Sequence, residues 1–468
     1  MADLRPLHDW SGAPASLTVW RPSAGSLEAA RQAPVSAVPP SHEQEQHLRA
    51  FLACRLRQED MARLLIMVWE EPGRCDLRAM THVLNAHLRR HETYHSWFEE
   101  GGDTIVRHVL AEPSALQLEP VMVGEVNAEQ WQRHVMATPG PFAWDCFRFG
   151  ILQRAGGFTC FASIDHLHAD STAIAFLMDE IHAAYRAVID GDVRPRLGQA
   201  GSYLEYCSGQ RRRATAMTLE DPEVAEWVAF LHRNHGRMPP FPLPLGVQDD
   251  RCLSAYLRAD ILDGAAMAIF EEACHAAGAR VIGGLLACAA LTERELAGAS
   301  RYCVVTPTTT RKTAEDFRMM GWCMGVVPVD FDVGGIAFSD VAAAAQHTFD
   351  HRLGLAQIPI ERVLELAAGL PTIRPAATGG VMLSYMDTSL PPLNAHIARD
   401  WHAASGKVYI NQGVASQVAL WFFRTPNGLT LTAGYPDNST AHHSMERYVG
   451  ALRDTCRALR PARAGTGA

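Results

Sequence analysis

Apolar runs and helical stripes of apolar residues alternate along the first half of the chain. Residues 64–69 form an apolar run of strand length, and residues 147–152 and 158–164 form two more. Asp76 stands where an N-cap is expected, and one face of the predicted helix after it is apolar (Leu77, Met80, Leu84, Leu88). A second predicted helix follows Asp170 and Ser171 and also has one apolar face (Ile174, Leu177, Met178, Ile181, Tyr185).

The second half of the chain has the same mixture of predicted elements. Residues 190–195 break the preceding helix and begin a predicted linker, and Asp221-Pro222 begins the next helix with proline at its first position. The proline-rich segment 238–246 is predicted to be an extended connector. The remaining predictions are helices over 263–277 and 281–297, strands over 302–306, 326–331, 380–385, 417–424 and 429–434, and a frayed tail from Pro461.

The order of these elements indicates the fold class. Strands and helices mix in both halves without the regular alternation of βαβ units, which favours an α+β protein. The chain has 468 residues, whereas single domains usually have ~100–200, so two lobes of similar size are expected. The predicted boundaries are an N-terminal lobe over 1–190, a linker over 191–220 and a C-terminal lobe over 221–468.

Composition and charge narrow the class of protein. The net charge is −9 and no basic stripe is visible, which argues against nucleic-acid binding. The eleven cysteines are scattered without CxxC spacing, and residues 1–10 lack the apolar core of a signal peptide, so free thiols in the cytoplasm are expected. The longest apolar run, residues 281–291, is short of the ~20 residues of a bilayer span, so any membrane contact is expected to be peripheral.

Candidate chemistry is concentrated in residues 165–171, at the junction of a predicted strand and a predicted helix. A strand holds such a side chain rigidly while the following loop exposes it, and histidine suits proton transfer near neutral pH. His166 is followed four residues later by Asp170, which could fix the shape of the loop. With 21 histidines and 51 acidic residues, this spacing also arises by chance, so a core histidine followed by a helix-capping aspartate is the alternative.

The same segment resembles the HHxxxDG signature of the chloramphenicol-acetyltransferase-like superfamily, which includes the condensation domains of nonribosomal peptide synthetases. The chain as a whole resembles the trehalose-lipid acyltransferases of the polyketide-associated group. The similar phrases extend over almost the whole chain, at residues 31–41, 73–80, 85–90, 96–99, 144–147, 241–246 and 435–438. The resemblance implies two chloramphenicol-acetyltransferase-like lobes with a substrate tunnel between them, and transfer of a fatty or polyketide acyl group from a thioester to a hydroxyl of trehalose or a related glycolipid.

The resemblance also implies roles for individual residues. His166 takes the place of the general base, and Asp170 takes the place of a structural aspartate that pairs with an arginine from the second lobe, for which Arg311 is the candidate. Residues 320–325 resemble a degenerate form of the DFGWG-like loop of condensation enzymes. Gly321 and Trp322 are therefore expected to shape the tunnel. The other residues expected along it are Asp165, His168 and Ser384.

Two positions depart from the signature. Asp165 replaces the first histidine, which is regarded as supportive, so loss of the chemistry does not follow. Ser171 replaces the glycine; serine would be strained at positive φ but suits a helix cap. His168 would face the same way as His166 in an extended segment and so line the acceptor side, or it would only pack or meet solvent.

No GxSxG elbow is present, so a covalent acyl–enzyme is not expected. The donor that stabilises the oxyanion is open, with Ser384 and Ser416 as weak candidates that are equally explained as ordinary strand or loop serines. No cofactor is expected beyond the thioester co-substrate, which is acyl-CoA or an acyl group on a carrier protein or polyketide synthase. The expected location is the cytoplasm, and the inner face of the membrane is the alternative.

Three alternatives stay open at this stage. Residues 91–95 read HETYH, the HExxH signature of zinc hydrolases, with His87 one helical turn earlier; the glycine and third histidine that metzincins add after it are missing, and no metal is expected. A free-standing condensation enzyme would use His166 to form an amide or an ester in nonribosomal peptide or polyketide synthesis. A degenerate, non-catalytic carrier-binding scaffold would tolerate the departures at Asp165 and Ser171.

Overall fold

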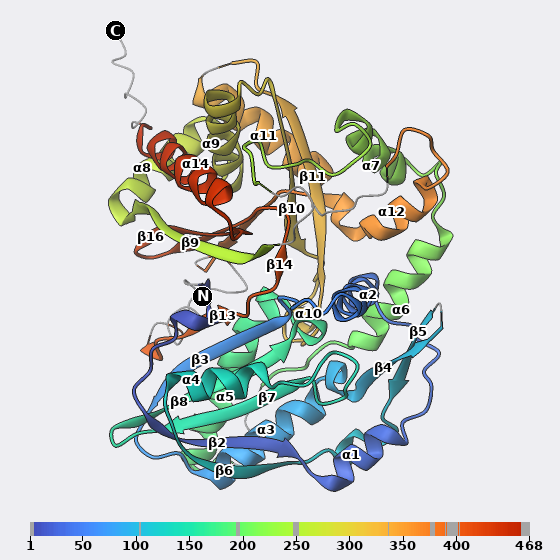
Figure 1. Ribbon diagram of the computed structural model, residues 1–468, viewed down its shortest axis with the longest axis vertical. Coiled ribbons are helices and arrows are strands. Elements are labelled where there is room, and N and C mark those ends of the chain that lie inside the picture. The colour runs from blue at the N-terminus through green and yellow to red at the C-terminus, as the bar shows by residue number, and fades with distance from the viewer. Residues whose placement is uncertain are drawn as a thin grey trace.

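The computed structural model describes residues 4–102, 104–192, 197–246, 252–335, 337–374, 380–388, 390, 401 and 403–459. The predicted tail from Pro461 and residues 193–196 of the predicted linker lie outside the described residues. The chain forms two lobes, each built on a seven-stranded sheet, one below the other in Figure 1. The α+β fold class is therefore confirmed.

The N-terminal lobe contains a mixed sheet of seven strands whose two shortest, β1 and β13, lie at one edge. The strand order is β1-β13-β3-β8-β7-β2-β6. The predicted strands in this lobe are confirmed as β3, β7 and β8, whereas β2 and β6 were not predicted. The bounds are β1 (Leu4–Pro6), β13 (Lys407–Ile410), β3 (Leu64–Pro72), β8 (Gly157–Asp165), β7 (Phe147–Gln153), β2 (Ala15–Pro22) and β6 (Leu118–Val126).

Strand β3 is apolar from Leu64 to Trp69 because both faces of this stretch are covered. Successive side chains of a strand point to opposite faces. Met67 and Trp69 pack in the core that α3 and α5 close, whereas Ile66 and Val68 pack in the core that α4 closes. The helices of this lobe are α1 (Ala24–Arg31), α3 (Leu77–Arg90), α4 (Ala128–Met136) and α5 (Ser171–Ile189), and a small hairpin pairs β4 (Ser96–Gly101) with β5 (Thr104–Val109).

The C-terminal lobe has a sheet in the order β11-β10-β12-β15-β16-β9-β14. Helices α8, α9, α11 and α14 supply side chains to its main apolar core. The predicted helix 281–297 is confirmed with the same bounds. The elements are β11 (Met324–Asp332), β10 (Arg301–Thr309), β12 (Met382–Asp387), β15 (Ala419–Thr425), β16 (Gly428–Pro436), β9 (Cys252–Asp263), β14 (Val414–Ala415), α8 (Gly264–Ala276), α9 (Val281–Ala297), α11 (Phe338–Arg352) and α14 (Ser439–Arg457).

No single helix among the described residues has both the length and the apolar character that crossing a bilayer requires. The pair α8 and α9, bent by 94° at the break between them, meets those requirements only when the two are taken together, and only by length and composition.

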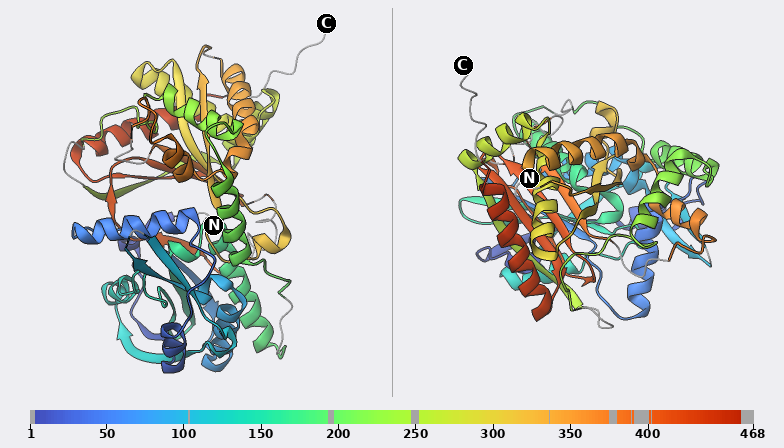
Figure 2. Two further views of the ribbon diagram at one scale, coloured as in Figure 1. Left: turned by 90° about the vertical axis from the view of Figure 1, so that its right-hand side faces the viewer. Right: turned by 90° about the horizontal axis from the view of Figure 1, so that it is seen from above.

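Four helices lie between or beside the lobes: α2 (His42–Leu56), α6 (Tyr203–Ala216), α7 (Pro222–Arg233) and α12 (Ile360–Ala367). Figure 2 shows α2, in blue, lying at the boundary between the two lobes. Helix α6 occupies much of the stretch 191–220 for which a linker was predicted. Short 3-10 helices complete the elements used below, among them η2 (Glu92–His95) and η4 (His166–His168), and a one-turn helix, α10 (Ala314–Phe317), follows β10.

One strand crosses from the second half of the chain into the first sheet. β13 pairs antiparallel with β3 and parallel with β1. Directly after it, the Asn411 side chain accepts hydrogen bonds from the backbone N–H groups of Arg63 and Leu64, at 3.0 and 2.8 Å. The range 221–468 predicted for the C-terminal lobe thus contains a strand of the N-terminal sheet.

Candidate active site

The segment 165–171 makes a tight turn between strand β8 and helix α5. Asp165 ends the strand, and its side chain accepts a hydrogen bond from the Leu167 N–H at 3.1 Å, which closes the 3-10 turn η4. Asp170 caps α5 by accepting from the Ala173 N–H at 2.8 Å. The His166 N–H donates to the Arg63 carbonyl at 2.7 Å. The backbone on both sides of His166 is therefore fixed by hydrogen bonds.

Asp170 also meets the arginine predicted for it. Arg311 Nη1 lies 2.6 Å from Asp170 Oδ2, and both side chains are fully buried. The same oxygen accepts a second hydrogen bond from the Cys323 N–H at 2.8 Å. Asp170 is thus both a helix-capping residue and the structural partner of Arg311, because one of its carboxylate oxygens caps α5 and the other binds the second lobe.

Arg311 extends this connection into the loop between α10 and β11. It donates to the carbonyl oxygens of Met319 and Gly321, at 3.4 and 3.0 Å. Gly321 has φ +150°, and a Cβ atom there would lie 2.3 Å from the ring of Tyr203. The loop therefore requires glycine at this position, both for its backbone and for its close approach to α6.

Trp322, the next residue, lies over the candidate base. The ring centroids of His166 and Trp322 are 3.8 Å apart. His166 Nδ1 is buried without a hydrogen-bond partner, which leaves Nε2 as the nitrogen available to a substrate. Burial, followed by the positive field of His47, lowers the pKa of His166 to about 4. The imidazole is therefore neutral near pH 7, as a proton acceptor must be.

Asp165, expected along the tunnel, faces the other way. Its side chain is fully buried, with Oδ1 2.6 Å from His47 Nε2 on α2 and Oδ2 2.8 Å from Arg63 Nη1. Burial alone would raise the pKa of Asp165, but His47 and Arg63 outweigh it and hold the pKa below its usual range. The acid in place of the first signature histidine thus binds α2 and β3 to the turn.

His168 also points away from the substrate space. Its Nδ1 lies 2.8 Å from the Thr93 hydroxyl and its Nε2 lies 3.1 Å from Cys146 Sγ. The prediction that it faces the same way as His166 assumed an extended segment, whereas residues 166–168 form a 3-10 turn. His168 therefore packs in the interior of the N-terminal lobe and does not line the acceptor side of the cavity.

A cavity of about 610 Å³ lies between the lobes, and His166 is part of its wall. Trp322 and Ser384 line it as expected, and so does Ser171. Asp165, His168, Gly321 and Ser416 are not among its lining residues within the described chain. Most of the wall is apolar and comes from both lobes, including Leu65, Ile174, Val305, Met382, Met386, Trp421 and Phe423.

A profile of the condensation-domain family matches residues 51–368, more than half of the chain.

The chain belongs to the condensation-domain family.

Individual relatives agree with this assignment. The acyltransferase PapA3 of Mycobacterium tuberculosis is 38% identical over 448 residues, 96% of this chain and 94% of that protein. The trehalose-2-sulfate acyltransferase PapA2 is 40% identical over 97% of this chain and 96% of its own. The 2'-acyl-2-O-sulfo-trehalose (hydroxy)phthioceranyltransferase PapA1 is 40% identical over 99% and 89%. PapA2 and PapA1 are also proteins of Mycobacterium tuberculosis. The chain is thus an acyltransferase of the Pap group of condensation-domain proteins.

Solved structures agree as well. The PapA2 acyl transferase superposes with a TM-score of 0.92 at 40% identity, over 97% of this chain and 98% of that one. The first condensation domain of the calcium-dependent antibiotic synthetase superposes with a TM-score of 0.67 at 16% identity, over 90% and 96%. The second likeness is one of fold, and it confirms the two-lobed architecture expected from the sequence.

The HETYH segment of this condensation-domain protein does not form the zinc site that its spacing suggests. His91 is the C-cap of α3 and residues 92–95 form the 3-10 helix η2, so the two histidines do not share one helix face. His95 Nε2 bonds to the Leu88 carbonyl at 3.0 Å. Glu92 accepts from the Ser202 hydroxyl and the Leu204 N–H at 2.6 and 3.1 Å. The carboxylate and the two histidines are therefore committed to separate structural contacts.

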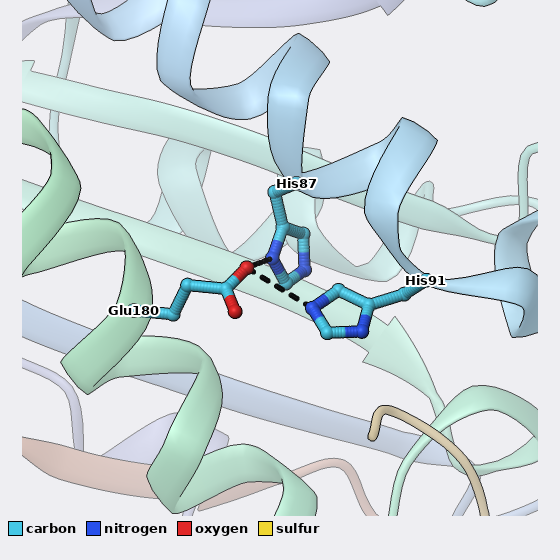
Figure 3. Close-up of side chains that lie close together, drawn as sticks. All are labelled: His87, His91 and Glu180. Atoms are coloured by element: carbon cyan, nitrogen blue, oxygen red, sulfur yellow. Dashed lines mark hydrogen bonds and ion pairs between the residues drawn. The ribbon is translucent and has the colours of Figure 1, made fainter. Parts of the chain in front are cut away.

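A different trio does converge. Figure 3 shows His87, on α3, and His91, the C-cap of that helix, facing Glu180 on α5. Glu180 Oε1 lies 2.7 Å from His87 Nδ1 and 3.0 Å from His91 Nε2, and Arg90 Nε binds the other carboxylate oxygen at 2.9 Å. These three ligand atoms lie within 4.8 Å of one another, a spacing that a metal ion could bridge.

The hydrogen bonds around the trio favour a structural role. The Met320 N–H points at His91 Nδ1 from 3.4 Å, so Nδ1 accepts and Nε2 carries the proton that it donates to Glu180. Burial would raise the pKa of Glu180, yet His91 and His87 hold it well below its usual range. The Glu180 carboxylate thus accepts hydrogen bonds from three side chains, and the network joins α3 and α5 to the Met320 loop of the other lobe.

Several site residues had no local sequence signal. His47 and Gln44 lie on α2, a polar helix, and Gln44 Nε2 donates to the Leu167 carbonyl at 3.1 Å. Both contact the turn at 165–168 from more than a hundred residues away in sequence. Only a buried aspartate in place of the first signature histidine, which calls for cationic or hydrogen-bonding partners, could have prompted a search for them.

Proposed function

We propose that this enzyme moves an acyl group from a thioester to a hydroxyl of trehalose or a trehalose-derived glycolipid, with His166 as the general base. The position of His166 carries the proposal, because its imidazole is neutral and lines a cavity enclosed by both lobes, beside the ring of Trp322. A relative named for acyl transfer to trehalose sulfate is 40% identical over 97% of the chain, which supports a sugar hydroxyl as acceptor.

In the proposed reaction, His166 Nε2 accepts the hydroxyl proton as the acceptor oxygen attacks the thioester carbonyl. The tetrahedral intermediate then collapses, the C–S bond breaks, and the imidazolium returns the proton to the leaving thiolate. One side chain serves as base and then as acid, and no acyl–enzyme forms. A positioned base contributes ~10²–10⁴-fold to the rate. Alignment of two substrates in one cavity and stabilisation of the oxyanion supply the remainder. Ser384, on the cavity wall, is the candidate oxyanion donor.

The proposed donor is acyl-CoA or an acyl chain on a carrier protein or polyketide synthase, and no other cofactor is required. The apolar wall of the cavity suits an acyl chain, because burial of each methylene contributes ~0.8 kcal/mol. We place the reaction in the cytoplasm, with peripheral contact at the inner face of the membrane if the acceptor is a glycolipid. The free thiols of all eleven cysteines support a reducing compartment.

Mass spectrometry of products from a panel of acyl-CoA donors and sugar acceptors tests the proposal, with His166→Ala as the control. An acyl ester of trehalose that forms only with the unaltered enzyme is the expected result. If the enzyme acylates amines to amides and leaves sugars untouched, it is a free-standing condensation enzyme instead. If it neither transfers nor hydrolyses any acyl thioester, the non-catalytic alternative is correct.

A further inference from the structure

Two carboxyl groups give one end of the cavity a negative character. Glu43 on α2 and Glu361 on α12 both line the cavity, together with Gln46. Helices α2 and α12 pack against each other, which brings the two acids to the same end. The rest of the wall is mostly apolar and includes side chains from β1, β12, β13 and β15. The cavity thus offers carboxyl groups suited to hydroxyl groups and apolar surface suited to an acyl chain.

The two acids are close enough to influence each other's ionisation. Burial, together with the charge of Glu43, raises the pKa of Glu361 to about 7. Burial likewise raises the pKa of Glu43. Glu43 receives hydrogen bonds from Gln210 Nε2 at 2.9 and 2.8 Å, which hold its carboxyl group in place. Each carboxylate keeps lone pairs that could accept hydrogen bonds from a ligand.

The cavity wall offers no cation to balance them. Within the part of the chain that the structure describes, its lining residues include neither lysine nor arginine. Arg211 acts on both acids through space, but its guanidinium is bonded to the carbonyl oxygens of Pro40 and Ser41 and to Glu45. Above the pKa of Glu361, an anionic group placed beside Glu43 and Glu361 would meet negative charge that no cation on the described cavity wall balances.

The acidic end is held in a fixed position relative to His166. Gln44 and His47, on the same helix as Glu43, bind Leu167 and Asp165 on either side of the candidate base. A molecule bound at the acidic end of the cavity therefore lies on the α2 side of the His166 ring. The His47 ring on this helix lies near the candidate base, with its centroid 6.3 Å from that of His166.

We propose that Glu43 and Glu361 bind the hydroxyl groups of the acceptor, and that the acceptor is an uncharged sugar rather than a sulfated one. The inference rests on the proposed function and adds the acceptor's charge to it. The relatives PapA2 and PapA1 are named for sulfated trehalose acceptors. Carboxylates suit the hydroxyls of a neutral sugar, whereas like charges at close range oppose the binding of a sulfate.

The test is competition between two acceptors for the purified full-length enzyme with one acyl-CoA donor. Trehalose and trehalose-2-sulfate are supplied together at about pH 8, above the pKa of Glu361, where that carboxyl group is charged. The expected ratio of kcat/KM favours trehalose by roughly tenfold or more. An equal or reversed preference overturns the proposal. If neither sugar is acylated, the proposed function fails, and the acceptor assignment fails with it.

Variants then test whether the two acids are responsible. Glu361→Gln and Glu43→Gln should each raise the KM for trehalose several-fold and lower the ratio of kcat/KM for trehalose over trehalose-2-sulfate. Acyl-CoA hydrolysis without acceptor is measured on each variant and reports whether the fold and the donor site persist. Glu365→Gln removes an exposed carboxylate from α12, the helix of Glu361, and is the matched control. Its ratio of kcat/KM for the two sugars should be unchanged. If both cavity variants keep the trehalose KM and the preference of the unaltered enzyme, these acids do not bind the acceptor.

Discussion

Arg311 Nη1 and Asp170 Oδ2 lie 2.6 Å apart in an ion pair that joins the two lobes, and neither side chain is exposed to solvent. The pair connects the turn that carries His166 with the loop that carries Trp322. One contact therefore sets both the stability of the boundary between the lobes and the geometry of the cavity.

Asp170→Ala is expected to destabilise the protein. It leaves the buried Arg311 without its partner and also removes the cap of α5, and breaking a buried pair costs about 3–5 kcal/mol. Chemical denaturation followed by circular dichroism measures this loss, and activity should fall with it. Glu129→Gln, which breaks an exposed ion pair with Arg133, is the control and should change stability little. An Asp170→Ala protein of normal stability that lacks only turnover would show that the aspartate is not structural.

His166→Ala should abolish acyl transfer while the protein keeps its fold. Loss of a positioned base lowers the rate by ~10²–10⁴-fold, and the alanine removes an imidazole whose Nδ1 has no hydrogen-bond partner. Product formation and thermal unfolding are measured on the same preparation, with the exposed His8→Ala as control. Near-normal turnover by the His166 variant would remove it from the mechanism.

The pH dependence of kcat should report the lowered pKa of His166. Only the neutral imidazole accepts a proton, so lowering its pKa to about 4 extends the active form downward in pH. With saturating trehalose, kcat is expected to stay level from neutral pH to about pH 5 and to decline as the pH approaches 4. An acid limb near 6.5, the ordinary value for histidine, is the contrary result.

Gly321→Ala should impair the enzyme although the change adds only one methyl group. Its Cβ would lie 2.3 Å from the Tyr203 ring, and φ +150° is unfavourable for alanine. The loop carrying Trp322 must shift, so kcat should fall and the melting temperature should drop. Gly209→Ala, on α6 with open space around the added Cβ, is expected to be neutral or slightly stabilising. Equal behaviour of the two variants would refute this explanation.

Chelation by EDTA is expected to leave turnover and stability unchanged. His87 and His91 are already hydrogen-bonded to one oxygen of Glu180, and its second oxygen binds Arg90. Elemental analysis of the purified protein gives the direct reading, with EDTA-treated and untreated samples compared in the transfer assay. A stoichiometric metal whose removal lowers the melting temperature would identify this trio as a metal site.

Local sequence was sufficient to predict elements with strong apolar patterns, and much less so elsewhere. Strand β3 and helix α9 are long apolar stretches, and the prediction found both. Strand β2 lies in a proline- and serine-rich beginning that hides it. β9 has only partly buried side chains along much of its length, so the pattern of its residues is weak. Their place in the sheets comes from pairing with distant strands, which no local pattern encodes.

The residues of the site also fall into a group that the sequence predicts and a group that it does not. The turn at 165–171 and its pairing with Arg311 were predicted through resemblance to a family, because the signature is continuous in sequence. The contacts of Asp165 with His47 and Arg63, and the two cavity acids, were not predicted. These residues come together only through the packing of α2 and α12 against the turn, so the sequence around each gives no sign of its neighbours.

The crossing of β13 into the N-terminal sheet has a consequence for how the protein is made. β1 pairs only with β13, and β13 also covers the edge of β3. While the ribosome has yet to synthesise residues 407–410, the nascent N-terminal sheet has an open apolar edge of the kind that pairs with other chains. Folding of this sheet must therefore finish after translation of most of the chain, and a fragment ending at the lobe boundary should aggregate.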